Sequence, residues 1–186
     1  MTLTDAGNAG EESVRNVLRE IKGTSISGFI RSKNICYYNR NFQIDFLLFV
    51  PKIGLVVLEV KNWKGTVKAT AGDKWLQEVI AGHRNEFGNA SLQSLRTSGM
   101  LLQILEKGKI NKWPIRPVVV FANDRAKILR ANGKNSPQTD IILKSMIPKW
   151  LSDNSSDEIM YRFTSSEFEM VKSVICQYTS EYVENA

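Results

Sequence analysis

Three charged residues interrupt two apolar runs in the first third of the chain. Asp45 lies inside FQIDFLLFV, and Glu59 and Lys61 lie at the end of GLVVLEVK. Two carboxylates that converge at a strand end form a site of hard oxygen ligands, which suits Mg²⁺ or Mn²⁺. A lysine on the same face could orient a metal-bound water or neutralise charge on a phosphate. The pattern therefore indicates metal-assisted hydrolysis of a phosphodiester.

The connection between the two runs decides whether these charges meet. Strand side chains alternate with a period of two, so Glu59 and Lys61 share a face. A three-residue loop, which pairs Val50 with Gly54 or Pro51 with Leu55, puts Asp45 opposite Glu59 or Lys61, whereas a two- or four-residue loop sends it to the other face. Strict alternation places four residues of the first run on one face: Gln43, Asp45, Leu47 and Phe49.

The Glu-x-Lys spacing has weight only in this context. A second copy, Glu20-Ile21-Lys22, follows an amphipathic pattern and has no partner carboxylate. The alternative for Glu59 and Lys61 is a structural ion pair at a strand edge.

A helix expected over residues 7–22 offers a third carboxylate. At about 100° per residue, Glu11 lies about 70° from the centre of its apolar stripe and Glu12 about 170° away. Glu12 can therefore pair with Arg15 and Arg19 in water. Glu11 is the candidate site residue, and the alternative is an acid favoured by the helix macrodipole.

Other patterns complete an α/β fold with a mixed β-sheet flanked by helices. We expect strands within residues 27–38, 43–50, 55–61, 65–79 and 115–123, and helices over 89–108, 140–152 and 164–183, the last capped at Thr164 or Ser165. Residues 130–140 read as a polar loop. Residues 1–186 are expected to form a single domain, with a core over about 7–125 and a helical C-terminal extension over about 140–186.

The charge distribution suggests a polyanionic partner. Residues 1–152 hold 23 Lys and Arg against 12 Asp and Glu, whereas residues 153–186 hold 2 against 7. A basic body fits nucleic acid, and the alternative is an ordinary solvated surface. The chain has no apolar run of membrane-spanning length and no signal-peptide pattern, so we expect no membrane partner and a cytoplasmic location.

Basic residues that follow the Glu-x-Lys motif could form a rim that contacts phosphates. They are Lys64, Lys68, Lys74, Arg84 and Arg96, each of which could equally be solvated surface. Trp63 and Trp75 could pack against the sheet margin or contact nucleic acid. His83 is the one histidine in the chain, so a histidine-rich metal site cannot be built, and the same shortage argues against zinc; we expect His83 in a loop or on the surface.

Three segments, GNAGEESV, QIDFLLF and GLVVLEVKNWKG, resemble the nuclease-related domain (NERD) family of the PD-(D/E)XK nuclease superfamily. The resemblance covers about Gly7 to Leu105. It implies a restriction-endonuclease-like core, a catalytic set of Asp45, Glu59 and Lys61 with Glu11 as the helical acid, and Mg²⁺ or Mn²⁺ held by the three carboxylates.

The family often shows Asn-Pro a few residues before a Gln. Here NASLQ keeps Asn89 and Gln93 but has Ala90 in place of Pro. Gln93 falls on the helix face of Thr97 and is a candidate for positioning the substrate.

Together these features predict a metal-dependent endonuclease that acts on DNA in preference to RNA. The alternative is an inactive nucleic-acid-binding or protein-interaction module on the same fold. A homodimer would allow a small nuclease to cut both strands. Strand preference and sequence specificity are left open.

Overall fold

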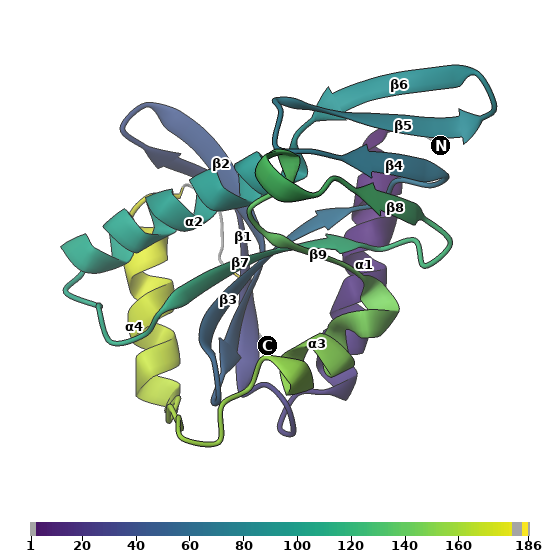
Figure 1. Cartoon of the computed structure of the whole chain (residues 1–186). Helices are drawn as coiled ribbons and strands as arrows, with labels where there is room; N and C mark the ends of the chain where they lie inside the picture. The colour runs from purple at the N-terminus through teal and green to yellow at the C-terminus, as the bar shows by residue number, and fades with distance from the viewer. Residues whose placement is uncertain (1–2, 180–183, 186) are drawn as a thin grey trace.

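A six-stranded and a four-stranded sheet organise the chain in the computed structural model, which describes residues 3–179 and 184–185 (Figure 1). The larger sheet has the order β10-β1-β2-β3-β7-β9, formed by Glu184–Asn185, Gly28–Tyr37, Arg40–Val50, Gly54–Lys61, Ile115–Phe121 and Asp140–Leu143. Strands β1, β2 and β3 are antiparallel neighbours, and β3, β7 and β9 run parallel. The predicted α/β class with a mixed sheet is confirmed.

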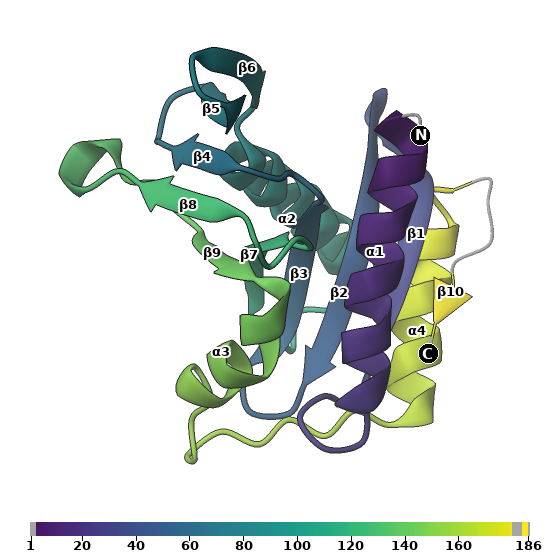
Figure 2. The same ribbon diagram turned by 90° about the vertical axis from the view of Figure 1, so that its right-hand side faces the viewer.

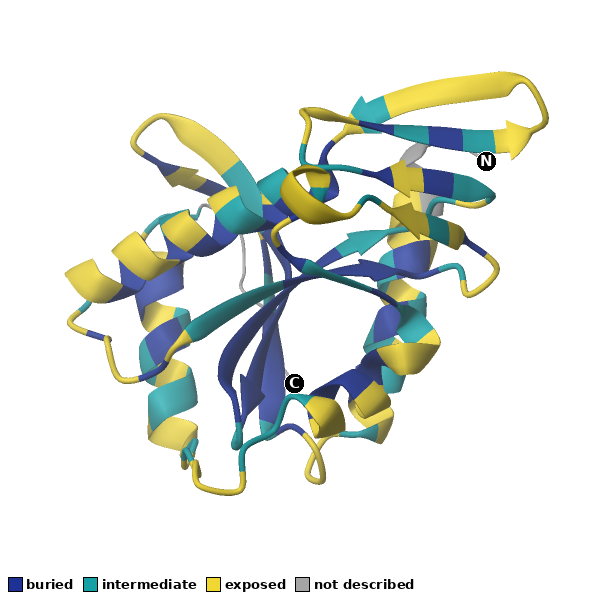
Figure 3. Ribbon diagram, in the orientation of Figure 1, coloured by how far each residue is buried: buried dark blue, intermediate teal, exposed yellow. Residues whose placement is uncertain are grey.

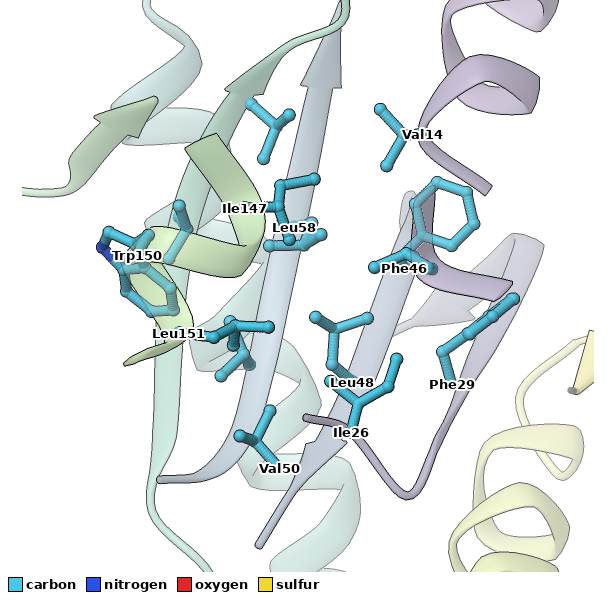
Figure 4. Close-up of a cluster of buried hydrophobic side chains, with 14 of the residues drawn as sticks. Val14, Ile26, Phe29, Phe46, Leu48, Val50, Leu58, Ile147, Trp150 and Leu151 are labelled. Carbon is cyan, nitrogen blue, oxygen red and sulfur yellow. The ribbon is translucent and has the colours of Figure 1, made fainter. Parts of the chain in front are cut away.

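Helices cover both faces of the larger sheet (Figure 2). Helices α1 (Leu3–Glu20) and α3 (Ile147–Asp153) pack on one face, and α2 (Ala90–Lys107) and α4 (Ser165–Cys176) pack on the other. Between them, the last seven residues of β2 and the first six of β3 are buried (Figure 3). Figure 4 shows the first of these two layers, where Val14 of α1 and Trp150 of α3 flank Phe46 and Leu58 of the sheet.

The hairpin between β2 and β3 has the three-residue loop that the site requires. Val50 pairs with Gly54, and the register continues to Phe46 opposite Leu58. One further step places Asp45 opposite Glu59. Gly54 has a φ of 111°, and a Cβ on it would lie 2.8 Å from atoms of Pro114. Glycine is therefore needed at this turn for backbone conformation and for space.

The smaller sheet has the order β6-β5-β4-β8, formed by His83–Gly88, Lys74–Ile80, Thr66–Ala69 and Lys127–Arg130. The strand pair β4–β5 was expected, whereas β6 and β8 were not. His83 is exposed at the start of β6, in agreement with the expected surface position. A third apolar cluster, which includes Val67, Trp75 and Phe121, joins this sheet to the end of the larger one.

Two helix predictions near the C-terminus need correction. The helix expected over 140–152 is wrong for its first half: Asp140–Leu143 form β9, followed by a 3₁₀ turn over Lys144–Met146 and then α3. This short apolar run completes the sheet by pairing with β7. The segment after residue 140 is thus not purely helical.

The last helix is shorter than expected. It ends at Cys176, and residues 180–183 of its expected span lie outside the described residues. Of the two candidate caps, Thr164 is the one formed, and it makes a capping box with Glu167 in which each side chain accepts from the other's backbone N–H. None of the helices in the described part of the chain is long and apolar enough to cross a membrane.

Candidate functional site

Asp45 lies at a β-bulge in β2. Ile30 of β1 pairs with Leu47, but Ser32 pairs with Ile44, so two residues of β2 face one residue of β1. The strict alternation expected along this strand is therefore wrong, and Ile44 packs in the same cluster as Leu47. A bulge re-aims nearby side chains, which is why such bulges recur beside active sites.

The carboxylate of Asp45 is held toward β3. Its Oδ2 accepts a hydrogen bond from the backbone N–H of Val60 at 2.8 Å, and its Oδ1 accepts one from Gln43 Nε2 at 2.6 Å. The side chain of Asp45 thus accepts the hydrogen bond of a β3 backbone N–H, as a backbone carbonyl would in a regular β2–β3 ladder. Asp45 is only 5% exposed.

Glu59 and Lys61 lie together at the end of β3, as predicted. Lys61 Nζ donates to Glu59 Oε1 at 2.7 Å and to Gln93 Oε1 at 3.0 Å. Glu59 is 2% exposed, and none of the described residues donates a hydrogen bond to its second carboxylate oxygen. This pair is therefore buried beside a second acid, unlike an ordinary ion pair at an exposed strand edge.

Helix α2 delivers Gln93 to the site. Asn89 caps the helix by accepting from Leu92 N, and its Nδ2 donates to the carbonyl oxygens of Thr70 and Gly72 in the turn between β4 and β5. The side chain of Asn89 fixes the start of α2. The helix therefore holds Gln93 against Lys61 even though Ala90 stands where the family often has proline.

Glu11 reaches the site from α1. The helix approaches β3 at Gly10, where a Cβ would lie only 2.6 Å from Asn62 Cβ. The carboxylate of Glu11 forms an ion pair with Arg31 of β1, with 2.7 Å between Oε2 and Nη2. Glu12 points away and pairs with Arg15 at 3.4 Å, as the helical spacing indicated.

The three acids stand in an electrostatically unfavourable group. Burial raises the pKa of Glu59 to about 7, and the charge of Asp45 adds to this effect while Lys61 opposes it. Burial also raises the pKa of Asp45 and, together with the charge of Asp45, that of Glu11. Negative charge here is thus only partly offset by Lys61 and Arg31.

These groups open onto a cleft of about 660 Å³ between the end of the larger sheet and the smaller sheet. Its lining includes all the acids and Lys61, together with Gln43, Asn62, Trp63, Lys64, Gln77, Val79, Asn85, Phe87, Gln93 and Asn123. Within the described residues, no three His, Cys, Asp or Glu side chains lie close enough together to hold a metal ion by themselves. The three-carboxylate metal set is therefore not assembled in this conformation.

The expected basic rim is only partly formed. Lys64 lines the cleft. Lys68 and Arg84 line a small depression with Leu76 instead. The alternation of β5 places Lys74 on the same face as Leu76, away from Trp75 and the cleft. Arg96 is exposed on α2, one turn after Gln93.

Several residues that the sequence did not single out belong to this region, among them Arg31, Gln77, Val79, Asn85 and Phe87. Asn85 and Phe87 alternate on β6, a signal that was available but is weak in so polar a segment. Trp63 is half-buried, stacks on Phe87 with ring centroids 4.6 Å apart and lines the cleft, so it belongs both to the sheet margin and to the site. Trp75 is buried in the core.

The sequence model of the nuclease-related domain (NERD) family matches residues 6–122. No curated protein and no solved structure matches the chain. The matched span includes every acid of the site, Lys61, Gln93 and the strands β5 and β6 that form the far wall of the cleft. Because the match covers more than half of its length, the chain belongs to the nuclease-related domain family.

Proposed function

We propose that the protein is a metal-dependent endonuclease that hydrolyses phosphodiester bonds in DNA. One observation carries the proposal: Asp45 and Glu59 are almost fully buried on the neighbouring strands β2 and β3, and both line a cleft beside Lys61. An ordinary structural site would neutralise or expose such acids, because burying a carboxylate without full compensation is costly.

The donor set fits a divalent cation with a preference for oxygen. Asp45 and Glu59 would hold Mg²⁺ or Mn²⁺, and Glu11, which the sequence resemblance adds to the set, would first have to leave Arg31. When bound, the ion would supply a water of lowered pKa and neutralise charge on the phosphate. The raised pKa of Glu59, caused first by burial and then by the charge of Asp45, is consistent with this fit, since a bound cation would balance that neighbouring charge.

Lys61 and Gln93 position the substrate in this proposal. The ammonium of Lys61 has three donors. Two of them bond Glu59 and Gln93, which leaves the third to bind a phosphate oxygen or orient the attacking water. Gln93 gives the ammonium a second hydrogen-bond partner besides Glu59.

The test is a cleavage assay on labelled DNAs and RNAs with Mg²⁺, Mn²⁺ or EDTA. Wild type should cut DNA only with metal, and Glu59→Ala and Lys61→Ala should abolish cutting. Binding without cutting under any metal would favour the inactive binding module instead. Cutting that survives both substitutions would place the activity elsewhere. The homodimer and the cytoplasmic location stay predictions.

A further inference from the structure

The cleft extends well beyond the acids. Its far wall consists of the inward-facing residues of β5 and β6, where Gln77 pairs with Asn85 and Trp75 pairs with Phe87. The outward face of the same strands carries the alternate residues, among them Leu76 and Glu78. The wall therefore presents amides and an aromatic edge to the cleft.

The amides of this wall are fixed in place. Gln77 is 6% exposed, its Nε2 donates to the backbone oxygen of Lys64 at 2.7 Å, and its Oε1 accepts from Asn85 Nδ2 at 3.5 Å. Asn85 itself is exposed, so its remaining donor and acceptor capacity faces the cleft. An amide offers both a donor and an acceptor, which matches the edge of a nucleobase rather than a phosphate.

The apolar groups of the wall suit the flat face of a base. Phe87 stacks on Trp63 and is half-buried, so part of its ring meets the cleft. Val79 also lines the cleft although it is 41% exposed. Aromatic and apolar side chains in such positions stack against unpaired bases.

The size of the cleft suits one or two nucleotides better than a base-paired duplex. About 660 Å³ lies within the range of about 300–1,000 Å³ typical of small-molecule pockets, which is room for one or two nucleotides. A phosphate placed beside Lys61 would therefore have its neighbouring base inside the cleft and out of a double helix.

We propose that the wall formed by Gln77, Val79, Asn85 and Phe87 binds an unpaired base next to the scissile phosphate. The substrate class is then single-stranded nucleic acid, or a strand end or bulge from which a base can leave the stack. This inference rests on the proposed function for the position of the phosphate. It adds a site that holds the base.

The test measures binding by fluorescence anisotropy in EDTA, so that the probe is not cut. The probes are a labelled DNA strand, its duplex, and the same strand with abasic sites. Asn85→Leu removes the amide at an exposed position, so it should not affect folding, and Phe87→Ala removes the ring. Thr66→Ala, on the outward face of the smaller sheet, is the matched control.

Wild type should bind the single strand about fivefold or more tightly than the duplex and lose that advantage on the abasic strand. Asn85→Leu and Phe87→Ala should bind the intact strand about fivefold or more weakly, and the abasic strand like wild type. Thr66→Ala should match wild type on every probe.

Equal binding of strand and duplex by wild type would overturn the inference. So would equal losses by the wall variants on intact and abasic strands, because the wall would then contact the backbone. Metal-dependent cleavage in those cases would leave the nuclease proposal standing. Conversely, base-dependent binding with no cleavage under any metal would support the wall and overturn the nuclease proposal.

Discussion

The guanidinium of Arg31 lies 2.7 Å from the carboxylate of Glu11, and both side chains are largely buried. The pair joins β1 to α1 beside the bulge that aims Asp45. Arg31 thus offsets one of three clustered acids, and it ties the helix that carries Glu11 to the strand that faces Asp45.

Removal of Arg31 should lower the stability of the protein, because the buried acids then lack a compensating charge. Arg31→Met leaves Glu11 buried without its partner, so we expect a loss of about 3 kcal/mol in the free energy of unfolding by urea. The double variant with Glu11→Gln should lose clearly less than the sum of the two single variants. In the control pair Arg19 and Glu12, 3.8 Å apart and half exposed, each variant should change stability by less than about 1 kcal/mol. Additive losses at Arg31 and Glu11 would contradict a coupled pair.

Lys61 should matter for catalysis more than for binding. Lys61→Met should lower the rate of metal-dependent cleavage by about 100-fold or more, because a donor aimed at the reacting phosphate is lost. Gln93→Leu should lower it by about tenfold, since Lys61 keeps Glu59 as a partner. Lys22→Met, in the second Glu-x-Lys copy, serves as the control and should cut like wild type. Single-turnover cleavage rates would check this. A loss of rate in Lys22→Met equal to that in Lys61→Met would contradict a specific role for Lys61.

The metal-free protein should lose stability as the pH rises. The pKa of Glu59 is about 7 in the folded chain, against 4.5 for an ordinary glutamate, so between these pH values the folded state holds a proton that the unfolded state has released. This contribution is full below about pH 4.5 and disappears as the pH rises through 7, at about 1.4 kcal/mol per pH unit. Glu59→Gln should flatten the slope, and Mg²⁺ should reduce it because metal favours the ionised carboxylate. Urea unfolding at several pH values measures this. If the stability of wild type and of Glu59→Gln changed equally with pH, the prediction would be refuted.

Gly10 should be intolerant of any side chain. Gly10→Ala places a Cβ 2.6 Å from Asn62 Cβ, so α1 must shift and we expect a loss of about 1–3 kcal/mol in stability. Gly7→Ala, one turn earlier on the same helix with open space around it, should instead gain up to about 1 kcal/mol. Thermal unfolding distinguishes the two, and a stable Gly10→Ala would show that the helix contact is loose.

Lys64 should contribute to nucleic-acid affinity and Lys68 should not. Lys64 lines the cleft, whereas Lys68 lies on the outward face of the smaller sheet. Affinity of wild type should fall steeply between about 50 and 200 mM salt. Lys64→Ala should reduce the salt slope by about one, and Lys68→Ala should leave it unchanged. Binding curves at several salt concentrations test this. An equal reduction of the slope in both variants would instead support the broader basic rim expected from the sequence.

Local sequence patterns determined much of the site. The alternation of β3 placed Glu59 beside Lys61, the helical spacing of α2 turned Gln93 toward the sheet, and the spacing of α1 separated Glu11 from Glu12. These results depend on neighbours within a few residues, where the period of a helix or strand settles which way a side chain points.

Longer-range contacts decided the rest. The parity of the β2–β3 loop was left open by the sequence, and Gly54 packing against Pro114 accompanies the register that brings Asp45 opposite Glu59. The bulge at Asp45 depends on pairing with β1, and the short run Asp140–Leu143 became a strand because β7 offered a parallel edge.

The cleft itself is a product of tertiary structure. Strand β6 is too polar to be predicted from its own pattern, yet its pairing with β5 places Asn85 and Phe87 on the wall that faces the acids. The pairing of β5 with β4 and with β6 turns Lys68 and Arg84 to the opposite face of the smaller sheet. The sequence by itself determined which residues could carry the chemistry, and the packing of two sheets determined what surrounds them, because a sheet face acquires its neighbours only when distant strands meet.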